Sequence, residues 1–463
     1  MNQKEREKQL STMPIPRLVF SYSIPAIIGM LVNATYNVVD RYWIGKLNNV
    51  DAMSGIGLTM PMTTIILGFM LLIGVGTTAC ISIRLGEQRH EEAARLLGNG
   101  LTLSIIIGLA LSVAGHLALE PILRTFGASP ATLPYARDYM RIILYGTTFS
   151  SIGFAMNHTI RGTGNPRRSA STQLLGAILN MILDPIFIFG LGLGVKGAAA
   201  ATVISQIVSM IWVMSYYAGK SSQIRLRLAN LVLKWQSVRD IMAIGASPFL
   251  LQIAASGITV LANRALRDTG GDIAIGAMTV ISSVAILFLM PIFGINQGLQ
   301  PILGYNYGAG QFSRVREALA YGVKLASVIV ILGFLVVQLF PAAIIRLFIN
   351  DPDLIRVGTF GIRVFLSMLP LLGFQIVATN YFQSVGKAKL AIFGSMLRQV
   401  IILLPLYLIL PRLFGLPGVW FASPIADFLS FVIALLMIGY EMKKLPKTAR
   451  ITSPAAEQET GPG

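Results

Sequence analysis

Long apolar runs, separated by short polar joints, recur along almost the whole chain. Each run has about twenty residues or more, the length that an α-helix needs to cross about 30 Å of hydrocarbon. The sequence predicts twelve such helices, at 17–41, 52–82, 95–122, 134–159, 168–192, 196–217, 240–264, 273–303, 316–345, 358–383, 389–411 and 416–440. Apolar helices also occur in soluble cores, but no amphipathic outer layer remains to cover twelve of them. We therefore expect an all-α integral membrane protein.

The composition agrees with this interpretation. Hydrophobic residues make up 54% of the 463 residues, charged residues only 12%, and the mean hydropathy is +0.69. A net charge of +17 is typical of nucleic-acid-binding proteins, but those proteins are far less apolar, so we expect no nucleic-acid partner. The single cysteine, Cys80, excludes an intramolecular disulfide, and three widely separated histidines disfavour a metal centre. We expect no cofactor.

Positive charge is unevenly divided between the joints. Alternate joints hold most of the Lys and Arg residues, beginning with the N-terminal segment and including Arg161, Arg167 and Arg168. Basic residues in short loops favour the cytoplasm, so both termini are predicted to be cytoplasmic, with the chain in the cell inner (plasma) membrane. The N-terminal segment lacks the apolar region of a signal peptide, so we expect the first run to be retained.

The two halves of the chain resemble each other weakly. At a nearly constant spacing, Pro25 is matched by Pro248, Asp40 by Asn263, Gly86 by Gly308, Asn157 by Asn380 and Gly197 by Gly418. With six spans in each half, the halves are related by a pseudo-two-fold axis along the membrane normal, a plan found in secondary transporters. The predicted organisation is a six-helix lobe at 1–217, a cytoplasmic linker at 218–239, a second six-helix lobe at 240–445 and a disordered cytoplasmic tail at 446–463.

The first span carries a polar face. Asn33, Asn37 and Asp40 are spaced to share one side of a helix, with Tyr36 beside them. An ionisable group inside a span costs about 2.5–3.5 kcal/mol, so Asp40 is a functional candidate. The alternative is an interfacial helix end beside Arg41.

The fifth and sixth spans carry further polar faces. Gln173, Asn180 and Asp184 share one face of the fifth span, and Thr202 and Gln206 lie on the sixth. Pro185 removes a backbone donor directly after Asp184, which frees carbonyl oxygens where the helix lines a cavity. The alternative role of Asp184 is only to satisfy that freed backbone.

Two carboxylates with amide and hydroxyl oxygens suit a small cation, and the same carboxylates could instead hold protons. We therefore expect coupling to H⁺ or Na⁺. The second half replaces Asp40 by Asn263 and Asp184 by Leu404, which restricts this chemistry to the first half.

Other polar and sulfur-containing residues have weaker claims. Asp427 with Arg398 or Lys324 is expected to form a structural or gating ion pair inside the second half. Met30 and Met60 are candidates to line an adaptable substrate cavity, although methionine also simply fills helix interfaces. The other candidates for this cavity are the polar residues Asn33, Tyr36, Asn37, Gln173 and Gln206.

Motifs for an enzyme or a nucleotide-driven pump are missing. The sequence has no Walker A loop, no HExxH and no GxSxG with a plausible triad. An intramembrane aspartyl protease also uses two membrane carboxylates, but the glycine-rich GLGLG at 190–194 has no aspartate where such an enzyme needs one. Transport driven by an ion gradient is the favoured interpretation, and an intramembrane hydrolase remains an alternative.

Several long motifs resemble one transporter family. IPAIIGMLVNATYNVVDRYWIGKLNNVDAMSGIGLTMP, GVGTTACISIRLGEQRHEEAARLLGNG, RGTGNPRRS and GINQGLQPILGYNYGAGQFSRVREAL are similar to segments of multidrug and toxic compound extrusion (MATE) transporters, in particular the DinF-like prokaryotic branch. The resemblance covers about residues 15–440.

The resemblance implies a V-shaped antiporter of two six-helix lobes that exports organic, often cationic, compounds in exchange for protons or sodium. It places the family's first-lobe cation site on Asp40, Asn180, Asp184 and Thr202. A lipid-precursor flippase of the related fold is the alternative. We expect small organic cations or drugs and the lipid bilayer as partners, and a monomer.

Overall fold

The computed structural model describes residues 3–47, 49–219, 222, 224–348 and 351–446. Every regular element within these ranges is a helix, as the apolar runs predict. The predicted tail falls, apart from residue 446, outside the described residues.

The predicted spans all correspond to helices. They are α2 (Ile15–Gly45), α3 with α4 (Val50–Leu58 and Met60–Gly86), α5 (His90–Leu117), α7 (Leu133–Gly162), α8 with η1 (Pro166–Pro185 and Ile186–Gly190), α9 (Val195–Ala218), the two parts of α10 (Trp235–Gly308), α11 (Phe312–Leu339), α13 with α14 (Pro352–Phe365 and Leu369–Ser384), α15 with η3 and α16 (Ala388–Met396, Leu397–Leu403 and Leu404–Phe414) and α17 (Leu416–Lys444). Four further short elements lie in the described part of the chain: α1 (Gln3–Thr12), α6 (Leu119–Thr125), η2 (Leu228–Leu231) and α12 (Pro341–Arg346).

Ten helices in the described part of the chain are long and apolar enough to cross a membrane, and the pair α13 and α14, bent by 48°, would make an eleventh span. The remaining predicted span is α7, which has 30 residues but also carries charged residues such as Arg137, Asp138 and Arg161. The helix α10 contains two spans, because Gly271 adopts φ 61° and ψ −156° and reverses the chain there.

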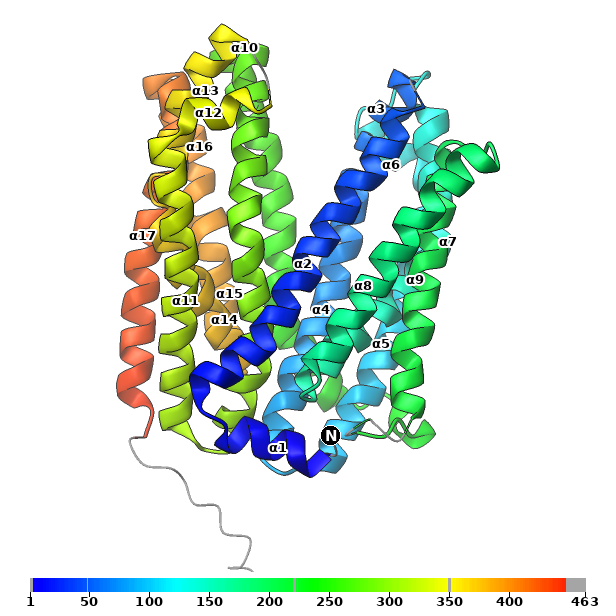
Figure 1. Ribbon diagram of the computed structural model, residues 1–463, viewed down its shortest axis with the longest axis vertical. Coiled ribbons are helices and arrows are strands. Elements are labelled where there is room, and N and C mark those ends of the chain that lie inside the picture. The colour runs from blue at the N-terminus through cyan, green and yellow to red at the C-terminus, as the bar shows by residue number, and fades with distance from the viewer. Residues whose placement is uncertain (1–2, 48, 220–221, 223, 349–350, 447–463) are drawn as a thin grey trace, which may run out of the picture.

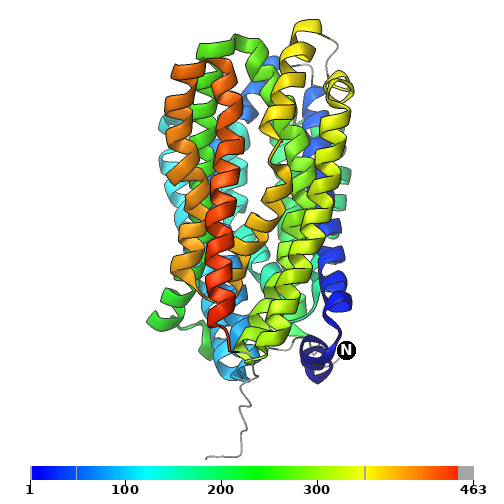
Figure 2. The ribbon, with the colours of Figure 1, turned by 90° about the vertical axis from the view of Figure 1, so that its left-hand side faces the viewer.

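The helices form two groups that splay apart at one end and meet at the other. Figure 1 shows α3 to α9 in one arm of this V and α11 to α17 in the other. Both the N-terminal helix α1 and the end of α17 lie at the closed end. The view from the side in Figure 2 also shows α1 and the end of α17 at the same end of the molecule. The expected all-α architecture of two lobes is confirmed.

Glycines bring α4 and α10 into backbone contact at the closed end. A Cβ on Gly86 would lie 2.0 Å from the carbonyl oxygen of Tyr305, and a Cβ on Gly308 would lie 2.2 Å from that of Ile83. Ile83 and Tyr305 are separated by the same spacing as Gly86 and Gly308, so the two halves make the same contact reciprocally. This is the arrangement that a pseudo-two-fold axis requires, and small residues are what allow membrane helices to approach so closely.

The helix α2 contacts both arms. Its beginning packs on α10 and α11, where the rings of Phe20 and Tyr321 lie 5.9 Å apart and Gly298 leaves room for Ser23. Further along, Gly29 lies against Gln173 of α8. Figure 1 shows α2 running obliquely from the second arm to the first.

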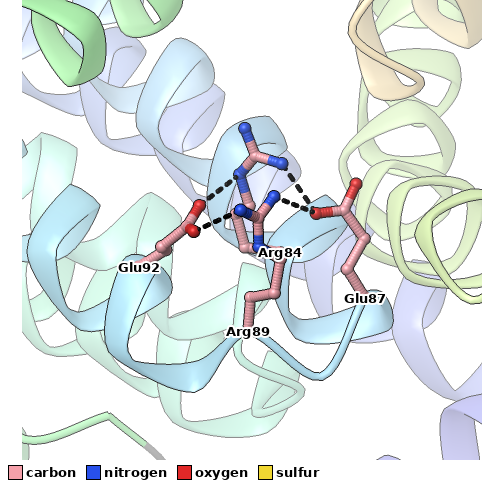
Figure 3. A network of polar contacts seen from close by, with 4 residues as sticks. All are labelled: Arg84, Glu87, Arg89 and Glu92. Atoms are coloured by element: carbon pink, nitrogen blue, oxygen red, sulfur yellow. Dashed lines mark hydrogen bonds and ion pairs between the residues drawn. The ribbon is translucent and has the colours of Figure 1, made fainter. Parts of the chain in front are cut away.

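Four charged side chains at the turn between α4 and α5 form ion pairs with one another. Arg84 and Arg89 each form ion pairs with both Glu87 and Glu92, at 2.5 to 3.4 Å, as Figure 3 shows. These contacts satisfy every charged group of the network locally.

The corresponding turn of the second half binds the end of the N-terminal helix. The spacing that relates Gly86 to Gly308 also relates Arg84 to Asn306 and Glu92 to Arg314. Arg314 Nε donates to Asn306 Oδ1 at 2.9 Å, and its Nη2 donates to the carbonyl oxygens of Leu10 and Met13 at 3.0 and 2.8 Å. The end of α1 is therefore bound to the second half.

Candidate functional site

Asn180 joins the polar faces of α8 and α9. Its Nδ2 donates to Asp184 Oδ1 at 3.1 Å, one helical turn away, and to Thr202 Oγ1 on α9 at 3.3 Å. Asn180 is 2% exposed and Asp184 is 0% exposed. Three of the four residues predicted to hold the coupling ion are thus in direct contact.

The same cluster leaves three buried oxygens without a donor. Asn180 Oδ1, Asp184 Oδ2 and Asp40 Oδ1 are each inaccessible and accept no hydrogen bond within the described structure. Burying such oxygens without a partner is costly. A small cation could be coordinated by several such oxygens, and a proton could be held by one of the two carboxylates.

Asp40 lies inside α2 and not at its end, because the helix continues to Gly45. Asp40 is thus followed by a little more than one turn of helix, which begins with Arg41. Asp40 and Asp184 are close enough for their charges to interact, so all four predicted ion-site residues lie in one region of the first arm.

Tyr139 of α7 is a neighbour that sequence reasoning missed. It lies within electrostatic range of Asp40, Tyr36 and Asp184 and packs beside Ile44 and other residues at the open end of the first arm. No local pattern marks it, because its role arises only when α7 is placed against α2 and α8.

The helical geometry changes directly after Asp184. The α-helix α8 ends at Pro185 and continues as one π-helical turn, in which Leu191 N donates to Ile186 O at 2.9 Å. Proline cannot donate to the preceding turn, and such π-turns are frequent at functional sites. The helix therefore changes its hydrogen-bond pattern after Asp184 instead of breaking, and it continues as one span to Gly190.

Gln173 and Met30 lie at the junction of the two arms. With its amide oriented to satisfy both partners, Gln173 donates to Gly29 O at 3.2 Å and accepts from Arg161 Nη1 at 3.3 Å. Met30 Sδ accepts from Gln297 Nε2 of α10 at 3.3 Å. The contacts of these two residues therefore connect α2, α7, α8 and α10.

Arg161 is not a loop residue, so its assignment to a joint between two spans is wrong. The helix α7 continues to Gly162, beyond its predicted end, so Arg161 is only 2% exposed. Its Nη1 donates to Gln297 Oε1 across the junction. Its burial depends on packing between distant segments, which the charge count along the sequence does not report.

The remaining cavity candidates are more peripheral. Met60 is 43% exposed, and its Sδ accepts from Arg41 Nη2 at 3.8 Å. Asn33 is exposed, Tyr36 and Gln206 are partly buried, and the side chain of Asn37 lies outside the described residues.

The second arm holds an ion pair at membrane depth. Arg398 Nε donates to Asp427 Oδ1 at 2.5 Å and Arg398 Nη2 donates to Ser423 Oγ at 3.1 Å, which confirms the expected pairing with Arg398. Within the described ranges, no three His, Cys, Asp or Glu side chains gather to hold a metal ion.

Comparison with known proteins places these features in a family. The sequence matches the MatE family profile over residues 25–186 and 248–409. It is 28% identical over 422 residues to the multidrug export protein MepA of Staphylococcus haemolyticus, covering 91% of this chain and 93% of the relative. It is 27% identical to MepA of Staphylococcus aureus strain MSSA476, covering 92% and 94% of the two chains.

Solved structures agree over nearly the whole chain. A multidrug resistance MATE family transporter of the MOP superfamily in its outward-facing conformation superposes with a TM-score of 0.89 at 26% identity, covering 95% of this chain and 98% of that one. A MATE protein in a bent conformation gives a TM-score of 0.90 at 25% identity, with the same coverage. With the family match extending over both halves, the chain belongs to the MatE family, whose members are transporters and not enzymes.

Proposed function

We propose that this protein is a secondary multidrug efflux antiporter that exports organic, often cationic, compounds in exchange for H⁺ or Na⁺. The observation that carries the proposal is the group of buried oxygens of Asp40, Asn180 and Asp184 that accept no hydrogen bond. The similarity to MepA proteins, which are named for multidrug export, supports the substrate class.

The coupling ion acts by satisfying these oxygens. A proton would bind to a carboxylate oxygen, such as Asp184 Oδ2, whereas Na⁺ would be bound by carboxylate, amide and hydroxyl oxygens together. Either ion removes repulsion between Asp40 and Asp184. The ion drives transport only by binding one conformation more tightly than another.

The helix α2 is suited to transmit this change. It carries Asp40 in the first arm, and its beginning packs on α10 and α11 of the second. A shift of α2 on ion binding therefore changes contacts with both arms. Rocking of the two lobes then exposes the substrate cavity alternately to the two sides, as in secondary transporters built from repeats.

The orientation follows from the position of the basic joints. Both described ends of the chain lie at the closed end of the V, and we assign this end to the cytoplasm because basic loops favour that side. The arms then open outward, in the plasma membrane. We propose that lobes 1–217 and 240–445 move in one monomer, joined by the linker at 218–239.

The test uses purified protein in liposomes and follows efflux of a fluorescent organic cation. An imposed pH gradient and an imposed Na⁺ gradient are compared for the parent, for Asp40→Asn and for Asp184→Asn. We expect one gradient to drive efflux in the parent and both substitutions to abolish it.

The matched control is Asp51→Asn, because Asp51 is an exposed carboxylate near the start of α3. This variant should transport like the parent. Gradient-driven efflux that survives Asp40→Asn and Asp184→Asn would exclude the proposed ion site, and a parent that responds to neither gradient would exclude antiport.

A further inference from the structure

Two side chains of α5 hold the segment between α9 and α10 in one conformation. Asn99 is 0% exposed. Its Nδ2 donates to the carbonyl oxygens of Asn230 and Val232, both at 3.0 Å, and its Oδ1 accepts from the backbone of Lys234 at 2.8 Å. Thr102 Oγ1 donates to the carbonyl oxygen of Leu231 at 2.8 Å.

A close backbone approach accompanies these bonds. A Cβ on Gly98 would lie 2.2 Å from the carbonyl oxygen of Asn230, so the segment fits on α5 only because residue 98 has no side chain. The described part of the linker is therefore a fixed structural element, and the outward direction of its side chains is determined by the fold.

The apolar residues of this segment divide into two groups. Ile224 is 3% exposed, and Leu226 and Leu231 pack against the large hydrophobic core. In contrast, Leu228 is 86% exposed, Val232 is 68% exposed and Trp235 is 78% exposed. Only the first group packs in the hydrophobic core. The second group, Leu228, Val232 and Trp235, is therefore available to contact an external partner.

Basic residues surround the exposed apolar group. Arg225, Arg227 and Lys234 are exposed, and the side chain of Arg239 is 66% exposed beside Asp240. Residues 218–239 contain no Asp or Glu. The surface is therefore both apolar and strongly positive.

We propose that this surface, which we call the linker surface (residues 225–239), docks onto anionic phospholipid headgroups at the cytoplasmic face of the membrane. Leu228, Val232 and Trp235 enter the headgroup region, and the basic side chains contact lipid phosphates. A lipid partner is favoured because Trp235 begins an apolar span, which places the surface at the membrane boundary. Tryptophan is enriched at that boundary, and basic clusters beside a span bind anionic lipid.

The test places an environment-sensitive fluorophore on Leu228→Cys in the full-length Cys80→Ala background, reconstituted in two kinds of vesicle. One contains phosphatidylcholine only, and the other also contains phosphatidylglycerol. We expect blue-shifted emission and quenching by spin-labelled lipid in the anionic vesicles. Replacing Arg225, Arg227 and Lys234 by Gln should reverse both effects, because each charge strengthens binding to an anionic surface roughly fivefold.

The matched control carries the label at Leu347→Cys. Leu347 is 84% exposed, so it is as accessible as Leu228, but it lies between α12 and α13 at the opposite end of the molecule. Its emission should not depend on the anionic lipid. Emission at position 228 that is typical of water in both vesicles overturns the proposal. Equally blue-shifted emission in both kinds of vesicle overturns the proposed preference for anionic headgroups. The readout does not require transport, so it stands apart from the proposed function.

Discussion

Arg398 and Asp427 form an ion pair at 2.5 Å inside the second arm, whereas Asp184 in the first arm is bonded to the neutral amide of Asn180. By the spacing that relates Gly197 to Gly418, Ser423 and Asp427 occupy the positions of Thr202 and Gln206. The second arm thus carries its own covalently attached cation at a face where the first arm has only the neutral side chains of Thr202 and Gln206.

The pair predicts a strong dependence on both partners. Arg398→Met leaves the buried Asp427 carboxylate without its cationic partner and should lower the free energy of unfolding by about 3–5 kcal/mol. The double variant Arg398→Met/Asp427→Leu should recover most of this loss, because no isolated charge remains. Thermal unfolding in detergent measures both changes.

An exposed pair supplies the control for this cycle. Arg356 and Asp353 lie 3.4 Å apart with side chains 81% and 67% exposed, so their coupling should be below about 1 kcal/mol. The single variant Asp427→Leu completes the comparison. If the losses in unfolding free energy of Arg398→Met and Asp427→Leu simply add in the double variant, then the two buried charges do not stabilise each other.

Thr202→Val should weaken ion binding without destroying the site. Asn180 loses one hydrogen-bond acceptor but keeps Asp184, and one hydrogen bond contributes about 1 kcal/mol. The ion concentration that gives half-maximal efflux should therefore rise roughly fivefold. Thr172→Val is the control, because Thr172 makes the same kind of hydroxyl hydrogen bond but within its own helix, to Arg168 O. Equal behaviour of the two variants would remove Thr202 from the site.

The reciprocal glycine contact predicts equal costs in the two halves. Gly86→Ala and Gly308→Ala each force a methyl group against a backbone carbonyl and should destabilise the protein by about 1–3 kcal/mol. Gly257→Ala has open space within 4 Å and should be neutral. Thermal unfolding decides this, and a large loss at only one of Gly86 and Gly308 would refute the symmetry of the contact.

Arg314→Gln should release the end of α1. The substitution removes charged hydrogen bonds to Leu10 and Met13, so hydrogen exchange across residues 3–13 should accelerate roughly tenfold or more. Arg17→Gln changes an exposed arginine nearby and should leave that exchange unaltered. Unchanged exchange in Arg314→Gln would mean that the other contacts of α1, such as the hydrogen bond from Asn306 Nδ2 to Leu10 O, are sufficient to hold the helix.

Features that depend on local spacing could be predicted from the sequence. The spans followed from the length of the apolar runs, and the contact between Asn180 and Asp184 followed from their separation by one turn. Contacts between distant segments could not be predicted in this way. The burial of Arg161 against Gln297 and the position of Tyr139 depend on how α7 packs, and the crossing of α2 between the arms leaves no periodic signal.

The contact of Gly86 with Tyr305 is repeated, with the two halves interchanged, by the contact of Gly308 with Ile83. This symmetry suggests how the chain originated. A contact in which each partner presents the same patch to the other is isologous, the kind made by two identical subunits across a two-fold axis. A six-helix ancestor that paired with its own copy in parallel would already have possessed this interface. Gene duplication and fusion would then have preserved the seam between the lobes while leaving each copy of the acidic cluster free to diverge.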